Sequence, residues 1–534
     1  MAEDDNENPS LEELMENLQL KANELLLRKE WQESVEVYTK FINLCLEQSI
    51  ELPSLLKIQK SFCLALSNRA RSLYKLREFT QALEDCDEAL MTESSHFEAL
   101  ICKGKILLRL NKYSLALDCF KKALLLDPQT NGNLETLNEY VEKCKKYVEK
   151  CKKLKLLSRT GAFDISNWVI NHFRGKLLVL AEFIGPIEIK KSEFSGRGLF
   201  AIKDMDAGTL LFVNKAIATE RCILSGEDSD QNAKLVMWKN FVDEVVKTTQ
   251  KWGRIRDWII TLSTGEDEDK LEVPEMSLFK PDGDVDNNLE NEDLDKARLM
   301  NILDVNSLVE ASVSSKVLGK NKDFYGYGLW VLASFINHSC IPNSRRLHIK
   351  DYILVHVSRD VKSGEEITLP YFDVLSPLEK RKEMLKEWGF NCNCKRCKFE
   401  EETSMKQEME VTEKWLELGL IDIGSAVHSV EEGMKRMRGI EKGYLRASFW
   451  DTYSKVYGSE KVLKEWGRLI PAADVVADSV GEVIGSDERI VKVLMEVLKR
   501  SENGGGEMME RVIRNGRRIY GNVVKNRLAI KTLL

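Results

Sequence analysis

The stretch FINHSCIPN, residues 335–343, contains Cys340, and a second stretch, CNCKRC, follows at residues 392–397. The spacing Cys-x-Cys-x-x-Cys in the second stretch places three thiolates within one tight turn, close enough to share a tetrahedral metal ion. A fourth ligand must come from elsewhere, and Cys340 is the best candidate. Four thiolates without water would make a closed structural zinc site that helps to fold the local chain; chance clustering of buried cysteines is the alternative. The predicted metal ligands are Cys340, Cys392, Cys394 and Cys397.

Short runs of β-type residues precede these cysteines. Gly, Asp and Ser turns separate such runs between residues 184 and 219, and the pattern returns from Tyr325 to Tyr371. Between them, residues 265–296 contain thirteen acidic residues and three lysines without apolar periodicity. This composition predicts a solvated, mobile insertion. The alternative is an acidic surface that attracts a basic substrate peptide.

An earlier part of the chain contains three similar helical segments. Each has two small residues twelve positions apart, which lets the helices of an antiparallel pair approach closely. The second and third copies are 34 residues apart, and the first lies 48 residues before the second, with extra residues near Leu52 and Pro53. Pro128 follows the third copy, where a helix should end. The small pairs are Ala22 with Ser34, Ala70 with Ala82, and Gly104 with Ala116.

This pattern resembles tetratricopeptide repeats over residues 17–128, which implies a stacked helical array that presents one face to a protein partner. Some members of that family clamp the C-terminal carboxylate of chaperones with Asn and Lys or Arg side chains. Asn23 and Asn68 match the asparagines, whereas Glu98 and Cys102 stand where the basic residues belong. Without those cations a carboxylate would lack charge-assisted hydrogen bonds, so we do not expect chaperone-tail binding.

The composition limits the classes of protein further. The chain has 534 residues, a net charge of −7 and twelve cysteines, most of which stand singly within helical patterns, as cysteines do in a reducing compartment. Its length indicates roughly three domains. No apolar run reaches ~18 residues, and the acidic N-terminus fits neither a signal peptide nor a transit peptide. We therefore expect a protein of the nucleus or cytoplasm that is neither secreted nor bound to a membrane.

Lysines are dense between Lys143 and Lys155. We interpret this segment as the solvated face of a helix, with contact to nucleic acid as the alternative. Phosphate neutralisation needs a basic stripe, and the negative net charge argues against one. We expect no direct nucleic-acid partner.

Four motifs indicate a second resemblance. GRGLFA (196–201), FINHSCIPN (335–343), GEEITLPY (364–371) and CNCKRC (392–397) occur in the order found in SET domains with a post-SET zinc segment. That family comprises protein-lysine methyltransferases that use S-adenosylmethionine. Helical repeats beside a split SET domain look most like the SET-and-MYND group. The MYND finger needs a further Cys/His cluster, and only Cys222 lies in the corresponding insertion, so the chain resembles a relative without that finger.

The resemblance implies roles for individual residues. The glycines of the GRG motif would let the backbone approach the methionine part of the cofactor. Asn337 and His338 match the pair that contacts its amino-acid and adenine groups. Asn306 matches another polar contact, and Phe390 an aromatic residue that packs on the adenine, while Cys340 matches the remote zinc ligand. The implied cofactor-binding residues are Gly196, Arg197, Gly198, Asn306, Asn337, His338 and Phe390.

Tyr371 is the predicted catalytic residue. A lysine amine must be neutral to attack a methyl group, although its reference pKa is about 10.4. A narrow apolar channel beside a cationic sulfonium would disfavour the ammonium form. Holding the amine and the methyl group in line would supply the other large contribution to the rate. The resemblance implies that the Tyr371 hydroxyl lies at the channel end. The alternative is an aromatic residue of the core.

Two neighbouring features refine this prediction. Many SET enzymes have an aromatic residue two positions before the tyrosine, where this chain has Leu369 followed by Pro370. This difference predicts a roomier channel that permits di- or trimethylation. Glu365 and Glu366 are not expected to form an acid/base pair, because adjacent strand residues point to opposite faces.

We therefore predict a multidomain α+β protein. Its function would be transfer of a methyl group from S-adenosylmethionine to a lysine ε-amine of a histone or another protein, with structural Zn²⁺ and with the repeats docking a partner or substrate. The alternative is an adaptor whose SET domain is catalytically idle. The predicted segments are an acidic disordered tail (1–16), tetratricopeptide repeats (17–157), a linker (158–180), a SET domain (181–388) with an insertion that includes the acidic stretch (222–320), a post-SET zinc segment (389–399) and a C-terminal helical domain (400–534).

Overall fold

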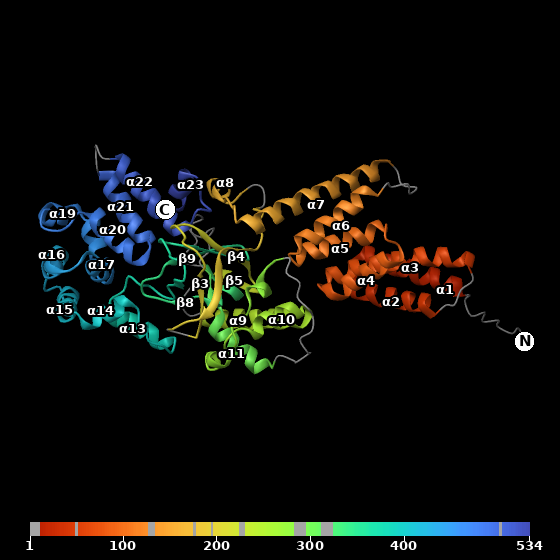
Figure 1. Ribbon diagram of the computed structural model, residues 1–534, viewed down its shortest axis with the longest axis horizontal. Helices are drawn as coiled ribbons and strands as arrows, with labels where there is room; N and C mark the ends of the chain where they lie inside the picture. Colours follow the sequence, from red (N-terminus) through yellow and green to blue (C-terminus); the bar gives the residue numbers. More distant parts are fainter. Residues whose placement is uncertain are drawn as a thin grey trace, which may run out of the picture. The chain divides into compact units, whose positions relative to one another are not determined.

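The computed structural model divides the chain into two compact units (Figure 1). The first comprises Met1–Arg159, Val245–Asp257 and Lys280–Asn291, and the second comprises Thr160–Glu244, Trp258–Phe279 and Glu292–Leu534. The residues that the structure describes are 11–47, 52–126, 134–174, 178–193, 196–223, 230–281, 295–310, 324–500 and 505–534.

The first unit begins as an array of helices. They are α1 (Leu11–Arg28), α2 (Trp31–Glu47), α3 (Leu52–Lys75), α4 (Phe79–Thr92), α5 (Phe97–Arg109), α6 (Tyr113–Leu125) and α7 (Leu134–Thr160). The six small residues of the predicted pairs are all buried. A Cβ atom on Gly104 would lie 2.7 Å from the Phe120 ring, so only glycine allows α5 and α6 to pack this closely. The helical array agrees with the predicted repeats.

The N-terminal boundary of the array differs from the sequence prediction, and the predicted end of the third copy cannot be compared with it. Helix α1 begins at Leu11, inside the segment 1–16 that was predicted to be a disordered tail, because its apolar positions pack against α2 and Met15 is buried. Residues 1–10 and Pro128 lie outside the described residues. The extra residues before the second copy lengthen α3 to 24 residues.

Helix α7 confirms the interpretation of the lysine-rich segment as a solvated face. Lys145 and Lys152 form exposed ion pairs with Glu142 and Glu149, three residues before each of them. The opposite side of the helix buries Cys144, Val148, Cys151 and Leu154.

The second unit contains three small sheets. Their strands are β1 (Phe183–Ile184), β2 (Ile187–Lys191), β3 (Arg197–Ala201), β4 (Leu210–Lys215), β5 (Thr219–Ile223), β6 (Leu308–Val309), β7 (Phe324–Gly328), β8 (Asn337–His338), β9 (Ser344–Ile349), β10 (Tyr352–Val357) and β11 (Glu366–Leu369). The strand orders are β1-β4-β10-β9, β2-β3-β11-β8 and β5-β7-β6. Most pairs are antiparallel, but β8 and β11 are parallel, so the chain must cross over between them.

Helices and 3₁₀ turns precede the first of these strands or stand between later ones in the chain. They are α8 (Ser166–Ile170), α9 (Asp230–Lys251), α10 (Gly253–Ile260), η1 (Glu268–Lys270), η2 (Met276–Phe279), α11 (Lys296–Asn306) and η3 (Val331–Phe335). The acidic stretch 265–296 is therefore structured over its first part, contrary to the expectation of a mobile insertion. Phe279 is buried against Trp258 and Phe335, which anchors this part. Residues 282–294 lie outside the described residues.

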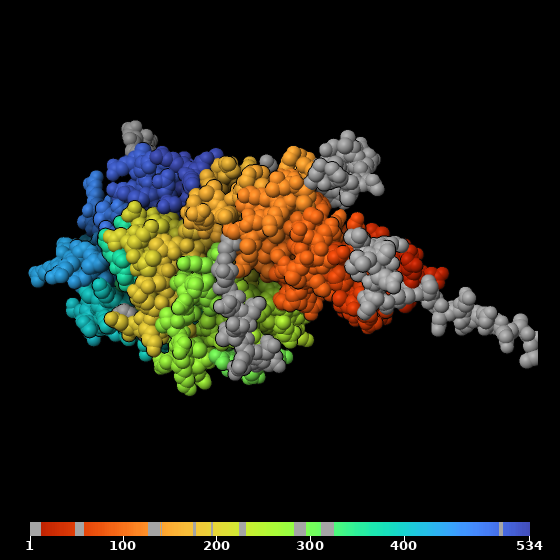
Figure 2. Space-filling model, turned by 45° about the vertical axis from the view of Figure 1, so that its right-hand side comes forward, coloured from red at the N-terminus to blue at the C-terminus, as the bar shows by residue number. Residues whose placement is uncertain are grey.

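The C-terminal part is helical, as predicted. Its elements are α13 (Leu378–Glu387), α14 (Lys395–Glu402), α15 (Met405–Glu417), α16 (Ile423–Gly433), η4 (Met434–Arg436), α17 (Gly439–Ser448), α18 (Trp450–Gly458), α19 (Glu460–Trp466), α20 (Ala473–Ile484), α21 (Glu488–Arg500), α22 (Gly505–Tyr520) and α23 (Arg527–Leu533). Helix α23 packs on α8, and the two adjoin in the space-filling view, where the C-terminal helices are dark blue (Figure 2). The α+β fold class is thus confirmed. No helix among the described residues is long and apolar enough to cross a membrane.

His356 lies where the C-terminal helices meet the sheet. Its side chain on β10 is 1% exposed, and Nε2 is 3.2 Å from the carbonyl oxygen of Arg518 on α22. Nδ1 has no hydrogen-bond partner among the described residues. Burial lowers the pKa of His356 to about 4. The ring is therefore neutral at pH 7 and donates its Nε2 proton to the helix.

Candidate active site and metal centre

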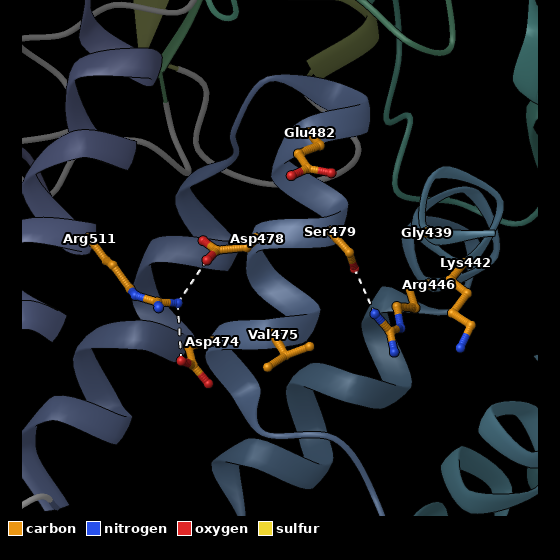
Figure 3. Close-up of a pocket in the computed structure, with 9 residues that line it drawn as sticks. All are labelled: Gly439, Lys442, Arg446, Asp474, Val475, Asp478, Ser479, Glu482 and Arg511. Atoms are coloured by element: carbon orange, nitrogen blue, oxygen red, sulfur yellow. Dashed lines mark hydrogen bonds and ion pairs between the residues drawn. The ribbon is translucent and has the colours of Figure 1, made fainter. Parts of the chain in front are cut away.

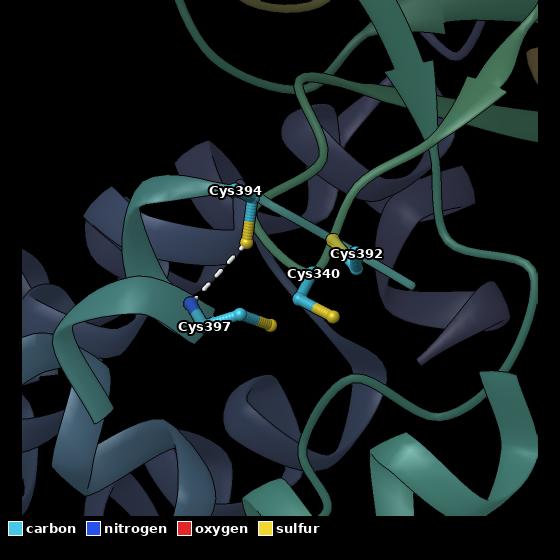
Figure 4. Close-up of side chains that lie close together, drawn as sticks. All are labelled: Cys340, Cys392, Cys394 and Cys397. Atoms are coloured by element: carbon cyan, nitrogen blue, oxygen red, sulfur yellow. Dashed lines mark hydrogen bonds between the residues drawn. The ribbon is translucent and has the colours of Figure 1, made fainter. Parts of the chain in front are cut away.

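Four cysteine sulfurs meet where the chain after β8 approaches the start of α14 (Figure 4). Cys340 follows β8, and the other three sulfurs come from residues 392–397 at the start of α14. All four Sγ atoms lie within 4.8 Å of one another. A tetrahedral zinc ion with Zn–S bonds of ~2.3 Å fits such a thiolate set, which is typical of structural sites. The structure thus brings together all four predicted metal ligands.

Local structure positions these sulfurs. Cys394 is the N-cap of α14, and its Sγ lies 3.5 Å from the Cys397 backbone nitrogen that donates to it. Hydrogen bonds from the neighbouring thiols, Cys392 first, lower the pKa of Cys340 despite its burial. Hydrogen bonding to Cys340 raises the pKa of Cys392 and of Cys397, so Cys340 is the thiol of the four that ionises most readily.

A buried charge network surrounds the sulfurs. Arg381 on α13 donates to Cys397 Sγ at 3.2 Å and forms an ion pair with Glu400. Arg396 donates to Glu400 at 2.7 Å and to the carbonyl oxygens of Val374, at 2.7 Å, and Cys340, at 3.3 Å. Both guanidinium groups are fully buried. Ser448, on α17, connects this network to the C-terminal helices, because it accepts from Arg396 and donates to Glu400.

Tyr371 lies directly after β11, beside the parallel partner strand β8. Thr368 pairs with Asn337 and Leu369 with His338 in that ladder. The Tyr371 backbone nitrogen donates to His338 Nδ1 at 3.1 Å, and its hydroxyl donates to the carbonyl oxygen of Ile336 at 2.8 Å. The crossover thus places the Tyr371 hydroxyl against the chain that leads into the Asn337–His338 pair.

Aromatic rings enclose this tyrosine. The His338 ring stacks on Phe372 with a centroid separation of 4.5 Å, and the Tyr371 ring lies 4.9 Å from Trp388. Phe390 is 6.0 Å from His338 and 6.3 Å from Tyr371. Trp388 remains 44% exposed. The cluster therefore offers flat apolar faces that are open to solvent on one side.

One histidine links the aromatic cluster to the metal centre. His338 Nε2 lies 3.3 Å from Cys340 Sγ, while its Nδ1 accepts from the Tyr371 backbone. With Nδ1 as acceptor, Nε2 bears the proton and donates to the sulfur. A metal bound by Cys340 would thereby fix the orientation of the ring beside Tyr371.

The electrostatic surroundings keep Tyr371 protonated. Burial raises the pKa of its phenol to about 12; the positive charge of Arg346 opposes this shift and the negative charge of Glu366 adds to it. Arg346 lies on β9, and no carboxylate forms an ion pair with it among the described residues. Burial lowers the pKa of Arg346 as well. The hydroxyl is therefore a neutral hydrogen-bonding group on which the positive charge of Arg346 acts.

The Gly196-Arg197-Gly198 loop is held by a residue of the acidic stretch. Glu268 accepts hydrogen bonds from the Arg197 backbone nitrogen at 2.8 Å and from its Nε at 2.7 Å. The Arg197 guanidinium is 3% exposed, and it also donates to the carbonyl oxygens of Thr261 and Glu272. A Cβ atom on Gly196 would lie 2.2 Å from the Glu268 side chain. The loop thus needs its glycine for this contact, and the Arg197 side chain faces the protein interior.

Two predicted polar contacts lie near this loop. The Asn337 side-chain amide donates to Glu366 Oε1 at 2.7 Å and to the carbonyl oxygen of Arg197 at 3.2 Å. Asn306 is buried at the end of α11, where its amide donates to the carbonyl oxygens of Ser263 and Ile302, both at 2.8 Å. Through these bonds Asn337 joins β8 to β3 and β11, and Asn306 joins the end of α11 to the chain after α10.

The adjacent carboxylates Glu365 and Glu366 have separate partners. Glu365 forms an ion pair with Arg359, at 2.7 Å, whereas Glu366 accepts from Ser192 and Asn337. Both serve as structural acceptors, Glu365 just before β11 and Glu366 at its start.

A polar hollow of about 300 Å³ lies elsewhere, among the C-terminal helices (Figure 3). Arg511 bridges Asp474 and Asp478 in it, and Arg446 is held by Ser479 and by Glu431. None of the sequence-predicted site residues lines it. Its charges largely neutralise one another within the chain.

Sequence reasoning missed four groups of this site: Glu268, Trp388, the Arg381–Arg396–Glu400 network and Arg346. Glu268 stands in an acidic run that indicates a solvated segment. Arg381 stands in a lysine- and glutamate-rich helical pattern typical of exposed faces, Arg396 stands among the cysteines of the CNCKRC motif, and Arg346 stands in a short strand. Only Trp388, two residues before Phe390, offered a local signal, as an aromatic residue near a predicted aromatic contact.

Two segments of the chain match family models. Residues 196–372 match the SET domain, and residues 97–130 match the tetratricopeptide repeat. The chain therefore contains a SET domain and a tetratricopeptide repeat, which confirms both resemblances inferred from the motifs.

Curated relatives and solved structures give further likenesses. A Gibberella zeae protein named "Methyltransferase" is 25% identical over 456 residues, which are 80% of this chain and 58% of the relative. The Arabidopsis thaliana "Histone-lysine N-methyltransferase ASHR2" is 32% identical over 110 residues, which are 18% of this chain and 28% of the relative. The chain thus spans less than two thirds of the length of either. A solved yeast structure, the TPR2B domain of Sti1 in complex with pHsp70, has a TM-score of 0.20 and 23% identity, and covers 25% of this chain and 96% of that one.

Proposed function

We propose that the protein transfers a methyl group from S-adenosylmethionine to the ε-amine of a lysine in a protein substrate. The observation that carries this proposal is the crossover that sets Asn337 and His338 beside Tyr371, with the four cysteines behind them. The match of residues 196–372 to the SET domain and the methyltransferase names of the relatives support it.

Tyr371 would position the lysine amine. Its hydroxyl is neutral at physiological pH and is held by the Ile336 carbonyl, so its oxygen keeps a lone pair toward an incoming N–H group. The positive charge of Arg346 acts on Tyr371, and the aromatic rings shield the buried side of the cluster from water. Both effects disfavour an ammonium ion, so they would help to supply the amine in its neutral, nucleophilic form.

The residues present fit the cofactor. When bound, S-adenosylmethionine supplies an electrophilic methyl group. His338 and Phe390 keep part of their ring surface exposed amid buried strands, and such faces suit a purine. Gly196, Gly198, Asn306 and Asn337 would shape the pocket for the rest of the molecule. Arg197 would act through the loop conformation, because its guanidinium is already engaged by Glu268.

Zinc would hold the end of the SET domain in place. Cys340, Cys392, Cys394 and Cys397 would bind it without an open position, so its contribution is to fold the segment that bears Phe390 and to orient His338. The helical repeats have no comparable cluster among their described residues. We assign them the docking of a partner or substrate.

A second candidate is an adaptor with an idle SET domain. One observation favours it: the amide of Asn337, the amide of Asn306 and the Arg197 guanidinium are already hydrogen-bonded within the chain. Titration calorimetry of the full chain with S-adenosylmethionine separates the candidates. The methyltransferase must bind it, whereas an idle domain would give no heat of binding.

The decisive experiment is transfer of labelled methyl from the cofactor into proteins of a cell extract by wild type and by Tyr371→Phe. The variant keeps the ring packing and loses only the hydroxyl. We expect labelled bands with wild type and at least about a 100-fold loss with the variant, as for removal of a positioned catalytic group. Equal labelling by both proteins would contradict the role of Tyr371. No labelling by wild type, together with no cofactor binding, would favour the adaptor.

A further inference from the structure

The helical array of the first unit presents a face built from alternate helices. Helix α3 contacts both α1 and α5, and α7 packs on α5 and α6 through Val148 and Cys151, which lie in one cluster with Leu107 and Phe120. Side chains on the exposed sides of α3, α5 and α7 therefore share one surface.

Four cations gather on this surface, which we call the basic face: Arg71 and Lys75 on α3, Lys105 on α5 and Lys143 on α7. Burial lowers the pKa of Lys105, and the charges of the other three cations lower it further, so each of the three lies within electrostatic reach of Lys105. The Lys105 ammonium lies 5.6 Å from the centroid of the Tyr147 ring. An aromatic face thus accompanies the charges.

The chain does not neutralise most of this charge. Among the described residues, no carboxylate forms an ion pair with Arg71, Lys75 or Lys105, while Lys143 pairs with Glu139 on its own helix. Other cations of the same array do have acidic partners, as Arg69 has Asp85. Three uncompensated cations therefore stand together in a protein whose net charge is −7. Like charges held together repel, and an anionic ligand would relieve that repulsion.

The asparagines predicted to match a carboxylate clamp are engaged within the array. Asn23 Oδ1 accepts from the Tyr38 hydroxyl at 2.6 Å and lies 3.5 Å from Asn68 Nδ2. Glu98 is exposed and Cys102 buried at the two positions where clamp cations belong. The basic face lies one turn further along each helix, at Arg71 and Lys105. It lacks the asparagine and cation arrangement that would select a chain terminus.

We propose that the basic face binds an acidic segment of a partner protein through its aspartate and glutamate side chains, without requiring a free C-terminal carboxylate. The guanidinium of Arg71 matches a carboxylate with two parallel N–H groups. The lysines Lys75, Lys105 and Lys143 supply further point charges on the same face. This docking is independent of methyl transfer, so it can be measured without cofactor.

The test uses the full chain and fluorescent twelve-residue peptides in which Glu and Asp alternate with Ser and Gly. One peptide ends in an amide, a second in a free carboxylate, and a third has Gln and Asn in place of the acids. Fluorescence anisotropy compares wild type, the double variant Arg71→Glu/Lys105→Glu, and Lys121→Glu as a control that reverses an exposed charge on α6. Circular dichroism establishes that the variants are folded, and Arg71→Ala/Lys105→Ala replaces the double variant if it is not.

We expect the amidated and free acidic peptides to bind equally, with at least a tenfold loss for the double variant and none for the control. Binding should weaken between 50 and 300 mM salt because exposed charges are screened. Three results would overturn the proposal: equal binding by wild type and the double variant, binding that requires the free carboxylate, or displacement of the acidic peptide by a much tighter single-stranded oligonucleotide. The last result would assign the basic face to nucleic acid.

Discussion

Arg381 Nη1 lies 3.2 Å from Cys397 Sγ, and both groups are buried. Four thiolates around a divalent ion have a net charge of −2, and the cations of Arg381 and Arg396 offset it where water cannot. Glu400 holds the two guanidinium groups at the correct distance from each other. The arginines thus act as outer partners of the metal ligands.

We predict that Arg381→Met releases bound zinc about 10-fold faster than wild type, as loss of an outer-shell partner does. Zinc transfer to a chromogenic chelator measures the rate, and the cobalt-substituted protein reports the ligand geometry by its absorption. Lys382→Met is the matched control, because Lys382 pairs with the exposed carboxylates of Glu379 and Glu401. Equal release rates in both folded variants would show that Arg381 does not act on the metal site.

Glu268 should be a structural anchor of the segment between β5 and β6. Glu268→Ala leaves the buried Arg197 guanidinium with carbonyl acceptors but no anion. We expect a loss of about 2 kcal/mol in the free energy of unfolding, less than for a fully buried pair because the Glu268 side chain is 28% exposed. Urea denaturation measures it. The exposed neighbour Asp269, changed to Ala, should alter stability by less than about 0.5 kcal/mol; similar losses in the two variants would contradict the anchor.

His356 makes stability depend on pH. Its folded-state pKa of about 4 lies below the unfolded value of 6.5, so the unfolded chain binds more protons between these values. The contribution of neutral His356 to the free energy of unfolding is complete above pH 6.5 and is lost as the pH falls toward 4. We expect about 2 kcal/mol of the free energy of unfolding to be lost between pH 7 and pH 5.

His356→Gln should flatten that part of the pH profile, because glutamine keeps a donor for the Arg518 carbonyl and does not titrate. Urea denaturation at pH 7, 6 and 5 compares the two proteins. Parallel profiles for wild type and variant would show that other groups cause the acid sensitivity.

Leu369 should set the number of methyl groups, given the proposed function. The residue is 2% exposed and pairs with His338, so it lies at the wall beside Tyr371. We predict di- or trimethylated product for wild type. Leu369→Phe should shift the product toward monomethyl-lysine, because the larger ring narrows the lysine channel. Mass spectrometry of the methylated substrate protein gives the ratio of mono-, di- and trimethyl-lysine. Only monomethyl product from wild type under forcing conditions would contradict the prediction.

Local chemistry in the sequence predicted much of the fold. The pairs of small residues, such as Gly104 with Ala116, predicted close packing of two helices. This was possible because the two residues of each pair are separated by a fixed number of positions in the sequence. The cysteine spacing predicted three ligands for the same reason. The fourth, Cys340, was a candidate because it stood alone within a polar motif, and the structure places it with the triplet.

The remaining contacts depend on residues that are distant in the chain and ordinary in composition. Arg197 and Glu268 are 71 positions apart, and an acidic run predicts solvation whether or not one member is buried. Arg381, Arg396 and Glu400 resemble the charged face of any exposed helix, so only the tertiary packing shows that they are buried. Which of these charged residues pair with one another depends on tertiary packing, and the amino-acid sequence shows no periodic pattern for it.

The parallel pairing of β8 with β11 has a consequence for synthesis on the ribosome. Cys340 emerges 57 positions before Cys397, and β11 emerges between them, so β8 has neither its neighbouring strand nor its fellow thiols when it first leaves the exit tunnel. At 5–20 residues per second this interval lasts about 3–11 s. A nascent chain interrupted before Glu366 would therefore hold β8 without its parallel partner, and one interrupted before Cys392 would hold Cys340 without its fellow ligands. Metal supply during translation thus becomes a determinant of yield.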